Sequence, residues 1–152
     1  MRVSAKADYA VRAAVELAGA ESPPVKGEAL AQAQDIPLNF LENILAQLRQ
    51  ARIVESRRGP EGGFLLAAPA DEITIADVIR AVEGPLATVR GSSPETLKFT
   101  GRAQPLGQVW VAVRANLRQV LETVTLADVA SGDLPGIVAE ITSDPEAWLP
   151  TD

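Results

Sequence analysis

A glycine-dense turn between two short apolar segments is the feature that most constrains how this chain folds. The flanking segments, Ile53–Ser56 and Phe64–Ala67, carry β-branched, aromatic and other apolar residues in runs short enough for strands. The turn between them, Arg57–Gly63, holds one proline and three glycines, which allow tight bends of the backbone. The sequence therefore predicts a β-hairpin with two arginines, Arg57 and Arg58, at its tip.

Helical periodicity occurs on both sides of this hairpin. Apolar residues recur every three to four positions in four segments, which we predict to be helices: Ser4–Gly19, Lys26–Ala33, Pro37–Gln50 and Thr74–Gly84. Pro37 suits the first turn of a helix, where its missing N–H costs little, and Asp35 is a candidate cap before it. Three helices followed by a hairpin are the order of a winged helix-turn-helix domain, which we assign to residues 1–84.

The second half of the chain is expected to be a loop, a long helix and a tail. Residues 85–104 carry glycine, proline and serine and are expected to connect the two parts. A helix is expected from about residue 105 to Ala127, within a dimerisation segment 105–130, and residues 131–152 are expected to form a loosely held tail. Apolar side chains spaced by three and four form a short heptad-like seam, typical of helices that pair: Trp110, Val113, Leu117, Val120 and Val124. The expected fold class is mainly α, a winged helix-turn-helix domain plus a long dimerisation helix.

The composition limits the chemistry that this chain can perform. Among its 152 residues there is no cysteine and no histidine, which excludes disulfides, thiolate and Ser-His-Asp catalysis, and cysteine-held clusters. Paired carboxylates, lysine and serine remain, but nothing assembles a nucleophile with a base, so we expect no enzyme activity and no cofactor. The N-terminus lacks a signal-peptide pattern, and no apolar run reaches the roughly 20 residues of a membrane span. We therefore expect a cytoplasmic protein without membrane contact.

The charge is unevenly distributed along the chain. The formal net charge is −6, which by itself disfavours a nucleic-acid binder. Residues 1–60 hold eight Lys/Arg and seven Asp/Glu, a net of +1, whereas residues 61–152 hold six and thirteen, a net of −7. The first 60 residues can therefore still present a basic face.

The predicted helix at Pro37–Gln50 and the hairpin tip are the candidate DNA-contacting elements. A helix about 10–12 Å wide fits a major groove about 12 Å wide, and arginines on a glycine-bent tip can enter a narrow minor groove. Solvated helix residues and an ordinary hairpin tip are the alternative interpretation. The predicted contacts are Leu38, Asn39, Phe40, Glu42 and Asn43 on the helix, Arg57, Arg58 and Gly59 on the tip, and Lys6 and Tyr9 for phosphates, with Arg12, Lys26, Arg49 and Arg52 as further phosphate candidates.

Four stretches of the sequence together resemble one known family. They are Met1–Ser4 with Lys6 and Tyr9–Val11, then Ile36–Leu45, Arg58–Leu66 and Ile73–Gly84. In this order they resemble the Rrf2 family of bacterial winged-helix transcription regulators, the IscR, NsrR and CymR type, with a weaker likeness near Trp110. The resemblance implies a homodimer with crossing long helices that binds double-stranded DNA at a palindromic operator, and we expect a repressor.

The resemblance also implies roles for single residues. Glu42 matches a family position that reads a base, and Arg58 matches one that enters the minor groove. Leu38, Asn39 and Phe40 match the start of the recognition helix. A winged-helix protein–protein adaptor that no longer binds DNA is the alternative, which the charge of −7 in residues 61–152 favours.

The chain departs from the family in the loop before the long helix. Cluster-binding members carry three cysteines there, whereas residues 90–104 of this chain contain none. Because carboxylates are poor substitutes for thiolates toward iron–sulfur clusters, we predict a member without a cluster. The loop does offer donors for an anionic effector, with a structural crossover or a partner-protein contact as alternatives. The candidate effector residues are Thr88, Arg90, Ser92, Ser93, Lys98 and Arg102.

Overall fold

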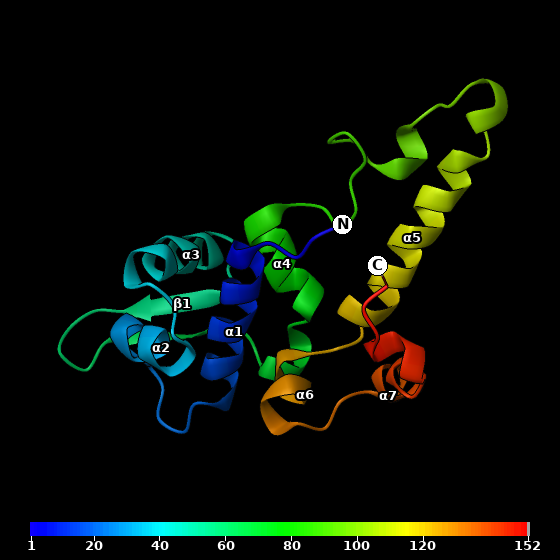
Figure 1. The fold of residues 1–152 in the computed structure, drawn as a ribbon. Coiled ribbons are helices and arrows are strands. Elements are labelled where there is room, and N and C mark those ends of the chain that lie inside the picture. The colour runs from blue at the N-terminus through cyan, green and yellow to red at the C-terminus, as the bar shows by residue number, and fades with distance from the viewer. Residues whose placement is uncertain (152) are drawn as a thin grey trace.

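The computed structural model describes residues 1–151 as a mainly helical molecule with one two-stranded antiparallel sheet. The helices are α1 (Ala5–Gly19), α2 (Gly27–Gln34), α3 (Leu38–Gln50), α4 (Ile75–Glu83), α5 (Leu106–Leu121), α6 (Leu126–Ser131) and α7 (Gly136–Thr142). The strands are β1 (Val54–Arg57) and β2 (Gly63–Leu66), and the 3-10 turns are η1 (Ala70–Glu72), η2 (Pro94–Thr96), η3 (Gly101–Ala103) and η4 (Pro145–Trp148). Figure 1 shows α1–α4 and the sheet on one side and α5 standing apart on the other. The predicted fold class is confirmed.

The core of the first part is built around α1. Four of its alanines are buried, and their small side chains let α3, α4 and α6 pack closely against this helix. From α3 comes one complete apolar face, with each side chain 1% exposed or less: Leu41, Ile44, Leu45 and Leu48. Burial of each such side chain contributes about 1.5–3 kcal/mol, so this face fixes the position of α3.

The helix ends follow the sequence at some positions and differ at others. Ser4, where the first predicted helix begins, is the N-cap of α1, and its hydroxyl oxygen accepts a hydrogen bond from the Ala7 N–H at 3.0 Å. The prediction that Asp35 caps the third helix is wrong. Asp35 instead ends α2 with a left-handed φ of 52°, and α3 starts after Pro37 without a side-chain cap.

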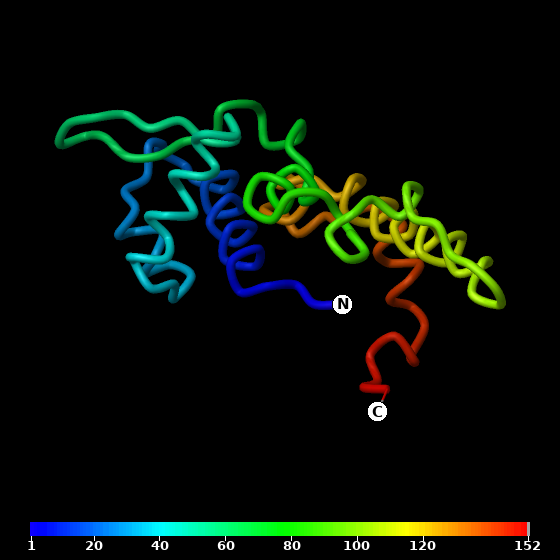
Figure 2. The backbone as a smooth tube through the Cα atoms, turned by 90° about the horizontal axis from the view of Figure 1, so that it is seen from above, coloured from blue at the N-terminus to red at the C-terminus, as the bar shows by residue number. Residues whose placement is uncertain are grey.

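The hairpin pairs β1 with β2 in a register that places Arg57 opposite Gly63. Val25 adds one further bridge, because its N–H donates to the Phe64 carbonyl at 2.8 Å and its carbonyl accepts from the Phe64 N–H at 2.7 Å. A Cβ on Gly63, whose φ is 151°, would lie 2.5 Å from the Val25 carbonyl oxygen, so this close approach requires glycine. Figure 2 shows the hairpin projecting beyond the helices, on the side away from α5.

The long helix is shorter than predicted, and the prediction that it continues to about Ala127 is wrong. α5 ends at Leu121, and the chain then turns back toward the first part. Val124 and Leu126 are 6% and 0% exposed there. The Ile75 N–H donates to the Val124 carbonyl at 3.0 Å, and the Leu126 N–H donates to the Ile73 carbonyl at 2.9 Å. Val124 is therefore buried within its own chain and does not lie on the seam of α5.

A short sequence repeat marks the start of this return, by which we mean residues 123–131. Residues 74–78 read Thr-Ile-Ala-Asp-Val and residues 125–129 read Thr-Leu-Ala-Asp-Val. Both form a capping box at the start of a helix, and Thr74 and Thr125 face each other in an antiparallel bridge. α6 then packs on α1. The packed domain thus consists of residues 1–84 together with residues 123–131.

The last segment contains more regular structure than the expected loose tail. α7 is followed by η4, and the Trp148 Nε1–H donates to the Thr142 carbonyl at 2.7 Å. Among residues 1–151, no helix combines the length and apolar character needed to cross a membrane.

Candidate nucleic-acid interface

The outer face of α3 is polar at its sides and apolar at its first turn. The five predicted contact residues of this helix are all exposed: Leu38, Asn39, Phe40, Glu42 and Asn43. Phe40 is 58% exposed, which is unusual for a phenylalanine and leaves its ring free to contact a ligand. The missing side-chain cap at Pro37 also leaves the first N–H groups of α3 without partners at the positive end of the helix dipole. This end can therefore accept a phosphate group.

The hairpin tip presents two free guanidinium groups. Arg57 ends β1, Arg58 lies in the turn, and both are exposed. Neither side chain makes a hydrogen bond or ion pair anywhere in residues 1–151. Gly59 has a φ of 100°, and its carbonyl accepts from the Gly62 N–H at 2.9 Å, which closes the turn. A backbone hydrogen bond thus closes the turn, and neither arginine has a carboxylate partner within residues 1–151.

The helix and the hairpin are joined directly. β1 packs on α3, and the Arg49 Nη1–H donates to the Ser56 Oγ at 3.2 Å. The sequence offered Arg49 as a phosphate candidate, and the structure gives it a second task at the start of the hairpin. Its partner Ser56 was missed because nothing in the local pattern shows that residues seven apart meet at this turn.

The expected phosphate contacts on α1 differ in whether their side chains already have partners within the chain. Lys6 and Tyr9 are half-buried at the surface. Arg12 has partners within its own chain. Its Nη2 lies 3.0 Å from Asp8 Oδ2, and its Nη1–H donates to the Gln34 carbonyl at 2.8 Å. Its guanidinium also lies 4.9 Å from the centre of the Tyr9 ring. These contacts hold the C-terminal end of α2 against α1, and the contact of Arg12 with phosphate stays a prediction.

The predicted seam lies along α5, where no residue is buried. Trp110, Val113, Leu117 and Val120 are half-buried, and Val109 is 50% exposed. The contacts of α5 within the chain are mainly with η2 and the end of α4. The helix therefore retains apolar surface that nothing in residues 1–151 covers.

The candidate effector residues are not brought together. Thr88 lines a hollow of about 420 Å³ between the N-terminal residues, the end of α4 and α5, while the other five line neither of the two described hollows. Val89 and Ser92 pair with each other around Arg90, whose φ is 53°. Lys98 and Arg102 are exposed farther along the loop.

The residues of this loop do not fit an iron–sulfur cluster. The chain has no cysteine or histidine, and within residues 1–151 no three acidic side chains gather as they would around a metal. Glu95 is the one carboxylate of residues 85–105, and it pairs with Arg114. Its backbone N–H and then the Arg114 guanidinium lower the pKa of Glu95 below its ordinary value. A carboxylate held in this way is no replacement for three thiolates.

Comparison with known proteins agrees with this geometry. The Rrf2 family model, described as "Iron-dependent Transcriptional regulator", matches residues 3–132. A Mycobacterium tuberculosis protein assigned by name to the HTH-type transcriptional regulators, Rv1287, is 54% identical over 145 residues, which are 95% of this chain and 90% of that protein. The regulator CymR of Bacillus subtilis is 33% identical over 132 residues, 86% of this chain and 91% of CymR.

Solved structures show the same arrangement. The structure of CymR, described as the global cysteine regulator of B. subtilis, matches with a TM-score of 0.73 and 31% identity, over 86% of this chain and 97% of that one. IscR of T. potens matches with a TM-score of 0.68 and 30% identity, over 100% and 94% of the two chains. In both comparisons nearly the whole of the other protein is covered, so the likeness extends beyond the first domain.

Proposed function

This chain belongs to the Rrf2 family of DNA-binding transcriptional regulators, and from that premise we propose that it is a homodimeric repressor that binds a palindromic operator. The observation that carries the proposal is the exposed polar face of α3 beside a hairpin tip with unpaired arginines. The apolar face of α3 is buried in the core, so the helix is firmly held while its outer face stays free to enter a major groove.

Each exposed residue of α3 suits a particular base edge. Asn39 and Asn43 can form paired hydrogen bonds with adenine, and Glu42 can accept from the amino group of cytosine. Leu38 and Phe40 offer apolar contact to the methyl group of thymine. We infer that these residues select the operator sequence.

The hairpin tip serves the adjacent minor groove. Arg57 and Arg58 are free of intramolecular partners, and Gly59 lets the backbone approach the duplex. Lys6 and Tyr9 on α1 contribute contacts to the phosphate backbone. Both kinds of contact depend on charge, so binding weakens as salt concentration rises.

A second copy of the chain covers the apolar surface of α5. Trp110, Val113, Leu117 and Val120 pair with the same residues of the partner, as in a short coiled coil. A two-fold axis between the copies presents two α3 helices to two half-sites, which requires a palindromic operator. The connecting loop 85–104 remains a proposed effector region, with Thr88 at the hollow beside α5.

Binding to DNA fragments from the chain's own promoter region tests the proposal, measured by fluorescence anisotropy at several salt concentrations. We expect specific binding whose salt slope falls by about 0.9 for each phosphate contact removed. Glu42→Gln is expected to change base preference, whereas Glu140→Gln on the exposed side of α7 is its matched control. Arg58→Lys keeps the charge but loses the planar fork, so it is expected to weaken binding less than Arg58→Gln. No specific binding at low salt would overturn the proposal in favour of a protein–protein adaptor.

A further inference from the structure

Three arginines gather near the C-terminal half of α5, within a part of the chain that is otherwise acidic. Residues 61–152 contain six basic and thirteen acidic side chains. Half of those basic residues meet here, because Glu122 pairs with both Arg80 and Arg118 while Arg114 lies one turn before Arg118 on α5.

The neighbouring carboxylates do not satisfy these guanidinium groups. Glu95 pairs with Arg114, and Glu122 is shared by Arg80 and Arg118, so two negative charges face three positive ones. The Nε of Arg118 lies 3.7 Å from Glu122 Oε1, which is beyond hydrogen-bond distance. Arg118 makes no side-chain hydrogen bond within residues 1–151, although each guanidinium offers five N–H donors. The group therefore keeps a charge of +1 and unused donors.

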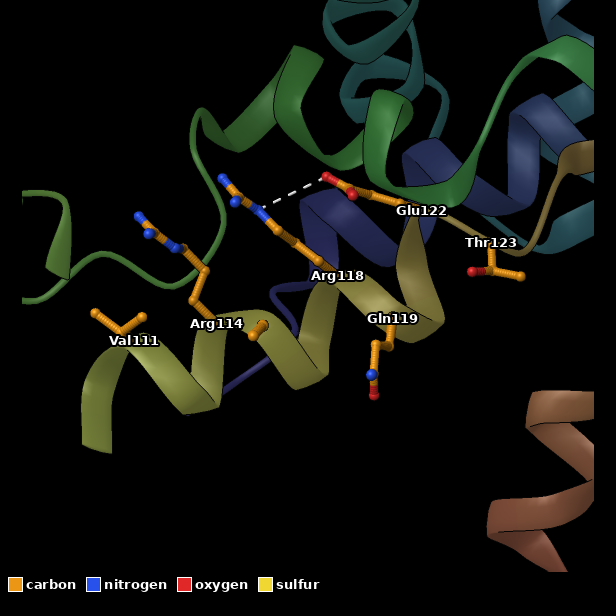
Figure 3. A pocket seen from close by; sticks show the side chains of 7 residues that line it. Val111, Arg114, Arg118, Gln119, Glu122 and Thr123 are labelled. Atoms are coloured by element: carbon orange, nitrogen blue, oxygen red, sulfur yellow. Dashed lines mark ion pairs between the residues drawn. The ribbon is translucent and has the colours of Figure 1, made fainter. Parts of the chain in front are cut away.

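A shallow hollow of about 380 Å³ adjoins these donors. It is lined by Val111, Arg114, Ala115, Arg118, Gln119, Glu122 and Thr123. Figure 3 shows the side chains of Arg114 and Arg118 extending from the same side of α5, with Gln119 projecting from the opposite side. The hollow thus combines two neighbouring guanidinium groups with an apolar wall formed by Val111 and Ala115.

Most of this face of α5 points away from the proposed dimer seam. Successive residues of a helix are about 100° apart, so Arg114 lies about 40° from Trp110, whereas Arg118 lies about 100° from Leu117 and Ala115 about 140° from Trp110. A partner helix paired along Trp110 and Leu117 therefore runs beside Arg114 and leaves Arg118 and Ala115 facing solvent. Binding at this face is therefore compatible with dimerisation.

We propose that this hollow is a binding site for a small organic oxyanion, whose carboxylate or phosphate group is held by Arg114 and Arg118. The planar guanidinium matches both kinds of oxyanion through two parallel hydrogen bonds. The carbon skeleton of the ligand lies against Val111 and Ala115. Glu95 and Glu122 compete for the same donors, so their carboxylates set how tightly the ligand binds.

The site also lies at the joint between α5 and the packed domain. Glu122 follows the last residue of α5, and residues 124–126 pair with residues 73–75 directly after it. An oxyanion that takes Arg118 from Glu122 changes the contacts at the start of this return. Any effect on DNA affinity rests on the proposed function, whereas binding of the oxyanion does not.

Titration of the full-length protein with inorganic phosphate and with succinate, followed by amide NMR shifts at constant ionic strength, tests the proposal. We expect saturable shifts around residues 111–123, and none with succinamide, the neutral analogue of succinate. Arg118→Gln is expected to weaken binding about tenfold, Arg118→Lys less, and Glu122→Gln to strengthen it. Saturation by succinate supports the site for an organic oxyanion, whereas saturation by inorganic phosphate alone contradicts the role given to the apolar wall.

Two comparisons can overturn this proposal. Arg102→Gln tests the connecting loop as the competing site, so a loss of binding with Arg102→Gln but not with Arg118→Gln would overturn it. Shifts that never saturate, or that equal amounts of chloride reproduce, would do the same. DNA affinity is measured separately on the same variants. If the unaltered protein binds the oxyanion but no operator DNA, only the proposed function is contradicted, and the reverse result contradicts only this site.

Discussion

The helices α3 and α5 are similar in length but are stabilised in opposite ways. α3 has 13 residues and buries four large side chains completely, whereas α5 has 16 residues and buries none. Propensity alone barely stabilises a helix of this size in water, so tertiary packing has to supply the rest. α3 finds that packing within its own chain, whereas α5 keeps apolar side chains exposed within residues 1–151, and a second copy covers them only in the proposed dimer.

In the proposed dimer, this difference matches the different roles of the two helices. A helix that presents side chains to DNA must be held rigidly, because a small error in its position removes base contacts. A helix that joins two copies is completed by association, so its stability depends on protein concentration. Residues 123–131 connect the two, since they follow α5 directly and yet belong to the core around α1.

Truncation of Leu126 is expected to have the largest effect, because it tests whether this return belongs to the packed domain. Leu126 is 0% exposed and part of the main core. Leu126→Ala is expected to lower the free energy of unfolding by about 2–5 kcal/mol, measured by urea denaturation. Ile141→Ala on α7, where the side chain is 49% exposed, is the control and should change stability little. Equal effects of the two substitutions would mean that residues 1–84 fold without the return.

A charge on the α5 seam should separate the two copies without unfolding either. Leu117→Glu is expected to give monomers in sedimentation equilibrium and to weaken operator binding roughly 100-fold, because the second half-site is then no longer bound as part of the same complex. Asn116→Glu places the same charge on the adjacent exposed face and is expected to leave the dimer intact. Dimers that survive Leu117→Glu would show that another surface of α5 makes the contact.

The two regions were also unequally predictable from the sequence. Helical periodicity and the glycine-dense turn located the α-helices and strands of the first 84 residues but not the turn η1, because α3 and its neighbours bury their apolar stripes within the chain. Along α5 the same reasoning failed at its end, since Val124 continues the heptad spacing while it packs in another direction. The Thr-x-x-Asp pattern at residues 125–128 is a capping box and was the local signal that could have ended this helix at the right place.

The candidate site was predictable only where a single segment supplies it. The exposed face of α3 and the arginines of the hairpin follow from local pattern. The commitment of Arg12 to the Gln34 carbonyl and the meeting of Arg80 with Glu122 join residues 22 and 42 positions apart. Pairings of this kind depend on how the helices pack, which periodicity does not report.

The two capping boxes allow the stability of α4, in the first 84 residues, to be compared with that of α6, in the return segment 123–131. Thr74→Ala and Thr125→Ala each remove one N-cap acceptor, and each is expected to cost about 1 kcal/mol of unfolding free energy. Thr100 precedes η3 without a side-chain cap bond, so Thr100→Ala is the matched control with little expected effect. A cost at Thr74 alone would show that α6 frays independently of the domain, although Leu126 is buried.

The smallest expected effect concerns the ion pair of Glu95 with Arg114, which stabilises the α5 region by surface charge instead of by packing. The pKa of Glu95 is lowered from 4.5, first by its own backbone N–H and then by Arg114. A lowered pKa means that the contribution of the pair is present above about pH 4.5 and is lost as the pH falls through the lower, folded-state value. In carboxyl-carbon NMR we expect Glu95 to titrate below 4.5. Arg114→Gln should raise that titration midpoint only part of the way toward 4.5, because the larger cause, the backbone N–H, remains. An unchanged midpoint would show that the guanidinium does not hold this carboxylate in solution.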